Sequence, residues 1–137
     1  MDTAKHEGYD IADLDAVKFS QEGTDVEIVN PRSGLKTGII ITVQGAFASR
    51  FQEMLARQKK REAMRSKNPV ARAVAQDEED ETSELLAEVT LGWRNMTERG
   101  NPVAFSKAEA RRVYEAYPVI RSQVLAAALE VANFVKG

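Results

Sequence analysis

The chain has 137 residues, of which 43% are apolar and 29% charged, and its formal net charge is -2. These values are typical of one folded domain, and they exclude the low-hydropathy regime of disordered chains and a strong overall attraction to polyanions or membranes. The chain has no cysteine, which excludes disulfides and thiolate metal sites.

The first 23 residues carry scattered apolar positions and little periodicity. We predict that residues 1–10 are disordered and that a short helical turn or an extended arm follows. The start of the chain has no apolar segment of signal-peptide length. The longest apolar runs, GIIITVQGAFA and VLAAALEVANFV, are shorter than the roughly 20 residues of a membrane span. We therefore expect a soluble intracellular protein that does not bind membranes.

A β-hairpin is predicted next. The segments TDVEIVN and GIIITVQG are rich in β-branched residues, and the turn sequence PRSGLKT separates them. In the first strand, Val26 and Ile28 alternate with polar residues, which suits a sheet with one solvated face. The second strand, Ile39 to Val43, is apolar on both faces. It therefore needs cover from a helix or from another chain.

A basic helix is predicted from about Ala46 to Lys67. Its apolar residues recur at helical spacing on one face, namely Phe47, Phe51, Met54 and Leu55. Between Arg50 and Arg72, eight bases stand against two acids, whereas residues 77–88 hold seven acids and no base. Residues 66–80 are predicted to be a mobile linker or a loose helix. The acidic segment can fold back on the basic helix or pair with it between subunits.

A third set of signals predicts helices in the last part of the chain. Thr82 or Ser83 caps a helix whose apolar stripe is Leu85, Leu86, Val89 and Trp93. The segment RNMTERGNPVA then forms a helix-to-helix connection. Ser106 and Glu109 form a capping box for a short helix. This helix stops at Pro118, which begins a last helix with Ile120, Val124, Ala127, Ala128, Val131 and Val135 on one side.

These elements predict an α+β fold in a single domain, residues 1–137, with an N-terminal β-hairpin followed by three to four α-helices. Signals of enzymatic chemistry are absent from the sequence. His6 is the only histidine, and the acidic run 77–81 lacks the alternating ligands and central glycine of a calcium loop. We therefore predict no catalytic residues, no metal and no cofactor. A nucleic-acid partner is not favoured, because aromatic and amide side chains that read bases are missing beside the basic helix.

Read end to end, the chain resembles the tail assembly chaperones of long-tailed, non-contractile bacteriophages. The matching segments are YDIADLDA, VEIVNPRSGLKTGIIITVQGAFASRF and LAEVTLGWRNMTERGNPVAFSKAEARRVYEAYPVIRSQVLAAALEVANF. In that family a Gly-Trp pair, a Gly-x-Pro-x-x-Phe-Ser step and a Tyr-Pro pair follow in order, as Gly92-Trp93, Gly100 to Ser106 and Tyr117-Pro118 do here. The likeness covers most of the chain except residues 60–80.

The resemblance implies a non-enzymatic protein of the host-cell cytoplasm that is absent from the mature virion. It would bind the tape-measure protein, keep it soluble, recruit tail-tube subunits and self-associate. Under this hypothesis, the candidate contact surface consists of Trp93, Met96, Val103, Phe105, Tyr114 and Tyr117. Two alternatives stay open, namely a small nucleic-acid-binding or regulatory adaptor that uses the basic helix 46–67, and a subunit retained in the tail.

Overall fold

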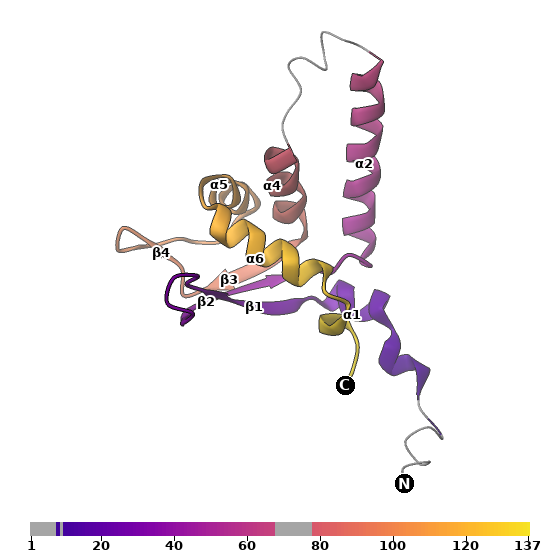
Figure 1. The fold of residues 1–137 in the computed structure, drawn as a ribbon, viewed down its shortest axis with the longest axis horizontal. Coiled ribbons are helices and arrows are strands. Elements are labelled where there is room, and N and C mark those ends of the chain that lie inside the picture. Colours follow the sequence, from indigo (N-terminus) through magenta and orange to yellow (C-terminus); the bar gives the residue numbers. More distant parts are fainter. Residues whose placement is uncertain (1–7, 9, 68–77) are drawn as a thin grey trace.

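The computed structural model describes residues 8, 10–67 and 78–137, and Figure 1 shows a small sheet from which helices rise. Its fold class is α+β, as predicted, with a hairpin early in the chain and helices after it. The predicted disorder of residues 1–10 and the predicted linker at 66–80 fall mainly outside the described ranges. Within the latter segment, residue 66 ends one helix and residues 78–80 begin another.

The predicted hairpin is confirmed. Strand β1 (Thr24–Val29) pairs antiparallel with β2 (Lys36–Val43). Asn30 organises the turn, because its side-chain oxygen accepts the amide of Arg32 at 2.9 Å and its carbonyl accepts the amide of Gly34. Gly34 has a φ of 74°, a left-handed conformation that glycine adopts without a steric penalty.

A third strand, β3 (Thr90–Arg94), pairs with the other edge of β2 and gives the strand order β1-β2-β3. Ile41 lies at the centre of this sheet, opposite Val26 on one side and Trp93 on the other. The edge of β2 thereby gains the backbone hydrogen bonds that the hairpin alone leaves open.

The prediction of a continuous helix up to the tryptophan is therefore wrong. Helix α4 (Glu78–Val89) begins earlier than expected, so that Thr82 and Ser83 lie inside it and do not cap it, and Ser83 is buried. The helix ends before the β-branched Thr90, and Gly92 follows two residues later. Both residue types have low helix propensity, and pairing with β2 gives this segment backbone hydrogen-bond partners along one edge.

The predicted helix-to-helix connection is also wrong, because residues after β3 form a second, two-stranded sheet. Strands β4 (Thr97–Glu98) and β5 (Asn101–Pro102) pair antiparallel, and Figure 1 shows this hairpin projecting from the body of the molecule. The two turn residues, Arg99 and Gly100, have φ values of 50° and 84°. Two consecutive positive φ values match the tight hairpin turn whose twist suits the flanking strands. Arginine is uncommon at the first position of such a turn, so the sequence does not indicate it.

Helices α5 (Lys107–Ala116) and α6 (Pro118–Leu129) follow as predicted. The Ser106 hydroxyl oxygen accepts the amide of Glu109 at 3.0 Å, which is the N-terminal cap expected from the sequence. The carboxylate of Glu109 accepts hydrogen bonds from Arg112 on its own helix. Pro118 occupies the first turn of α6, where its missing N–H costs nothing.

The core lies between the sheet and the helices. Helix α2 (Ser49–Ser66) stands beside α4, and α6 crosses the sheet (Figure 1). The Gln123 side chain of α6 donates to the carbonyl of Val29 and accepts its amide, both at 2.8 Å, which fixes the helix to the edge strand. The largest fully buried apolar side chains come from β2, α2, α4, α5, α6 and the 3₁₀ turn at Val131–Phe134, namely Ile41, Val43, Phe51, Met54, Leu86, Val89, Tyr114, Val124 and Phe134.

The structure corrects two predicted apolar faces. Phe47 precedes α2 and is 46% exposed, and Leu55 is 38% exposed. At the other end of the chain, α6 ends at Leu129, so Val131 and Val135 are not part of its apolar side. The chain continues as a 3₁₀ turn (Val131–Phe134), which places Phe134 in the core.

The two ends of the described chain meet at Gly45. Helix α1 (Ala16–Glu22) packs against the 3₁₀ turn that carries Phe134, and the Lys136 amide donates to the carbonyl of Asp13 at 2.7 Å. A Cβ at Gly45 would lie 2.6 Å from the Phe134 ring and 2.6 Å from the Ser20 hydroxyl. Glycine is therefore required here by close packing.

Gly45→Ala should destabilise the protein by about 1–3 kcal/mol, because the added methyl overpacks a closed interior. Urea unfolding monitored by circular dichroism measures this change. Gly92→Ala is the matched control, since a Cβ there meets nothing within 4 Å. Equal stability of the two variants would contradict the packing role of Gly45.

Candidate partner-binding site

The β4–β5 hairpin, which we call the arm (residues 96–103), is fixed at its base. The amide of Val103 donates to the carbonyl of Met96 at 2.9 Å, and the indole Nε1 of Trp93 donates to the carbonyl of Val103 at 2.7 Å. Asn95 turns the chain from β3 into the arm with a φ of 63°, and its side-chain amide donates to the carbonyl of Gly38 at 3.1 Å. Asparagine tolerates this left-handed conformation better than most residues do.

Trp93 and Phe105 meet at the foot of the arm. Their ring centroids are 5.0 Å apart and their planes are inclined by 88°, an edge-to-face arrangement that aromatic rings prefer. Phe105 is 37% exposed, and Trp93 is half-buried. The pair therefore lies at the boundary between the core and the surface.

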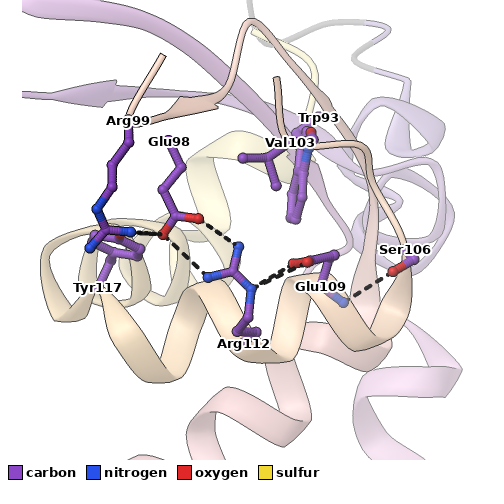
Figure 2. A network of polar contacts seen from close by, with 8 residues as sticks. All are labelled: Trp93, Glu98, Arg99, Val103, Ser106, Glu109, Arg112 and Tyr117. Carbon is purple, nitrogen blue, oxygen red and sulfur yellow. Dashed lines mark hydrogen bonds and ion pairs between the residues drawn. The ribbon is translucent and has the colours of Figure 1, made fainter. Parts of the chain in front are cut away.

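A network of charged and polar groups holds the tip of the arm, as Figure 2 shows. Arg112 of α5 donates from its two Nη atoms to the carboxylate of Glu98, at 3.2 and 3.0 Å, and from Nε to Glu109 at 2.7 Å. The hydroxyl of Tyr117 also donates to Glu98, and the guanidinium of Arg99 lies 4.0 Å from the same carboxylate.

These contacts change the acid-base behaviour of the network. The hydrogen bond from Tyr117, followed by those from Arg112, holds the pKa of Glu98 below its usual range. The same hydrogen bond raises the pKa of Tyr117. The arm is therefore held by an ionised carboxylate at neutral pH.

Among the hollows that border the arm, two are mainly apolar. The first, which we call the arm pocket, has a volume of about 290 Å³. Its walls are apolar and its rim is polar; it is lined by Ile39, Met96, Thr97, Glu98, Arg99, Val103, Val113, Tyr117 and Ile120. The second, which we call the tryptophan groove, has a volume of about 480 Å³ and is lined by Trp93, Met96, Val103 and Phe105 together with neighbouring residues of β3 and the arm.

The structure brings five of the six sequence-predicted contact residues to these hollows. Trp93, Met96, Val103 and Phe105 line the tryptophan groove, and Tyr117 lines the arm pocket. Met96 is only 7% exposed and packs in the core, although it also borders both hollows, and the sixth residue, Tyr114, belongs to the core alone.

Burial explains the different place of Tyr114. Its side chain is fully buried, and its hydroxyl is 2.7 Å from that of Thr90. Burial raises the pKa of Tyr114 to about 12. On α5, the residue turns towards α4 and the sheet, which periodicity alone does not reveal.

Sequence reasoning missed the groups that complete the arm pocket. Ile39 comes from β2 and Ile120 from α6, and both lie far from the arm along the chain. The pairing of Glu98 with Arg112 spans 14 residues and two elements, and no sequence spacing indicates it.

The prediction that the acidic segment folds back on the basic helix is confirmed for two pairs. Arg50 of α2 bonds Glu88 of α4 at 2.9 Å, and Arg61 bonds Glu84. The hydrogen bond from Arg61 lowers the pKa of Glu84. Within the described residues, no helix is long and apolar enough to cross a membrane, and no group of three or more His, Cys, Asp or Glu side chains could hold a metal ion.

Comparison with known proteins places this chain among prophage proteins. A family model described as YdaY prophage protein matches residues 46–137, a range that contains α2, α4, β3, the arm, α5 and α6. The chain belongs to the YdaY prophage protein family. No curated protein and no solved structure matches it.

Tyr117→Phe should raise the pKa of Glu98 towards the ordinary value of about 4.3, because it removes the hydrogen bond that lowers this pKa most. NMR titration of the side-chain carboxyl measures it. Since the folded pKa is depressed, the contribution of Glu98 to stability is fully present above the ordinary pKa and is lost as the pH falls through the folded value. Tyr114→Phe is the control, because that hydroxyl contacts Thr90. An unchanged Glu98 pKa in Tyr117→Phe would contradict the network.

Proposed function

We propose that this prophage protein is a tail assembly chaperone, which binds and solubilises the tape-measure protein and recruits tail-tube subunits while the tail is built. Membership of a prophage family supports a role in the life of a phage. The resemblance of the chain to tail assembly chaperones supports the finer role. The proposed role is non-enzymatic and is performed in the host cytoplasm, and the protein is absent from the mature virion.

The observation that carries the proposal is the gathering of apolar side chains around the arm. Trp93, Met96, Val103 and Phe105 line one continuous groove, with Phe105 more than a third exposed. An apolar groove beside a helix is a common way to bind the apolar stripe of a client helix.

A long tape-measure protein can be bound by many copies of the chaperone, each with moderate affinity. If each copy binds with moderate affinity, many copies on one client give a stable assembly, because neighbouring sites act at high effective concentration. Contacts between neighbouring copies would add to this effect, so the proposal includes self-association.

Co-expression with the tape-measure protein of the same prophage tests the proposal directly. We expect a soluble, elongated complex with several copies of the chaperone per client, measured by size exclusion with light scattering. The tape-measure protein expressed alone should be insoluble. A client that stays insoluble, or that is soluble without this protein, would overturn the proposal.

The alternative function uses the basic helix α2. Arg57, Lys59 and Lys60 are exposed on it, whereas Arg50 and Arg61 are paired with acids of α4. Exposed cations on one helix favour phosphate contacts, whose affinity falls steeply with salt. Salt-dependent binding to DNA or RNA that disappears when Lys59, Lys60 and Arg61 are replaced, together with no client complex, would favour this alternative.

Replacing both Trp93 and Phe105 by alanine should weaken the client complex by about 30-fold or more per site, because buried aromatic anchors carry about 2 kcal/mol or more at interfaces. Competition binding with the wild-type protein measures the loss, and circular dichroism tests whether the variant is folded. Phe47→Ala is the matched control, since Phe47 is equally an exposed phenylalanine but lies outside both hollows. Unfolding of the double variant would place the pair in the core and would contradict the assignment.

A further inference from the structure

The arm pocket has the size and the lining of a receptacle for one apolar side chain. Ile39, Met96, Val103, Val113 and Ile120 form its apolar walls. A cavity of roughly 150 Å³ holds a benzene molecule, so a volume of about 290 Å³ accommodates a leucine or phenylalanine side chain together with part of its backbone. This volume is at the low end of sites for free small molecules, which start at about 300 Å³.

The rim of this pocket carries the positive charge of Arg99, which makes only a weak contact within the protein. The carboxylate of Glu98 already accepts hydrogen bonds from Arg112 and Tyr117. The Arg99 guanidinium approaches it only to 4.0 Å, and the Arg99 side chain is 86% exposed. A contact of this length with a highly exposed guanidinium contributes little. Arg99 therefore has donors to offer to an acid of a partner.

The position of Arg99 is set by the backbone. It is the first residue of the tight turn, with a φ of 50°, and the turn leads directly into the network that anchors Glu98. The cation is thus presented at the rim by a short hairpin, and not by a long mobile loop. Side chains three or four positions apart on a helix lie about one turn, or 5–6 Å, from one another.

We propose that the arm pocket binds one apolar side chain of a helical client segment, and that Arg99 pairs with an aspartate or glutamate one helical turn from that side chain. This inference rests on the proposed function, because it specifies the chemistry of the client segment. It requires that the client segment carry an acidic side chain in addition to its apolar stripe.

The test uses overlapping peptides that cover the tape-measure protein of the same prophage. Segments that bind should shift the methyl NMR signals of Ile39 and Ile120, and they should carry an acid three or four positions from an apolar residue. Binding segments without such an acid, or binding that leaves both isoleucines unmoved, would overturn the inference. If only the complete tape-measure protein binds, the variants below are compared in that complex.

Two variants address the pocket and its rim separately. Ile120→Phe fills the pocket and should weaken binding at least tenfold. Arg99→Glu lies on an exposed turn, should leave the fold intact by circular dichroism, and should also weaken binding at least tenfold. Lys59→Glu is the charge-matched control on α2, and it should bind like the wild type.

A charge exchange provides the decisive measurement. A client segment whose acid is changed to lysine should bind Arg99→Glu at least fivefold more tightly than it binds the wild type. No rescue by this exchange, or Arg99→Glu binding like the wild type, would overturn the inference and leave the proposed function standing. Failure of the complete tape-measure protein to bind would overturn both.

Discussion

The central strand β2 is the constraint on which the rest of the structure depends. It has a hydrogen-bonding neighbour on both edges, and on one face Ile39, Ile41 and Val43 meet the core, with Ile41 and Val43 fully buried. The opposite face carries Thr42, whose hydroxyl donates to the carboxylate of Asp25 at 2.6 Å, so it is not the second apolar face that the sequence predicts. A strand of this kind has no stable place in a lone hairpin, because one edge and one face would be left in water. The chain supplies β1 from before it and β3 from almost fifty residues after it, and the helices cover the sheet. In a chain of 137 residues, nearly every element must contribute to this one core.

The recruitment of β3 decides where the candidate site forms. Because β3 lies along β2, the chain leaves the sheet at Arg94 and must reach the start of α5 at Lys107. The arm makes this connection. Trp93 is carried to the end of the sheet, where its indole N–H finds the carbonyl of Val103 and its ring meets Phe105. The aromatic pair and the arm pocket are thus consequences of the sheet order, and they bring β2 and α6 into the same site.

The features that the sequence predicts well are those decided by near neighbours. The turn after β1, the cap at Ser106 and the start of α6 at Pro118 each depend on side chains a few residues apart. The third strand and the arm depend on an edge of β2 that is distant in the sequence, and local propensity around Gly92 does not identify that edge. The same limit applies to the site. The residues of the tryptophan groove are close together in the sequence and were predicted as a group, whereas Ile39, Glu98 and Ile120 join the arm pocket only through the tertiary fold.

Two tyrosines on consecutive turns show how the fold separates stability from surface chemistry. Tyr114 faces the core, where burial raises its pKa to about 12 and its hydroxyl pairs with Thr90 of β3. Tyr117 stands at the junction of α5 and α6, more than a third exposed, and bonds the carboxylate of Glu98. The contact between Tyr114 and Thr90 lies inside the protein and is shielded from solvent. The second contact lies at the surface, where Arg112 and Tyr117 together hold the carboxylate of Glu98. The core therefore positions the arm, and the contacts around Glu98 fix its tip.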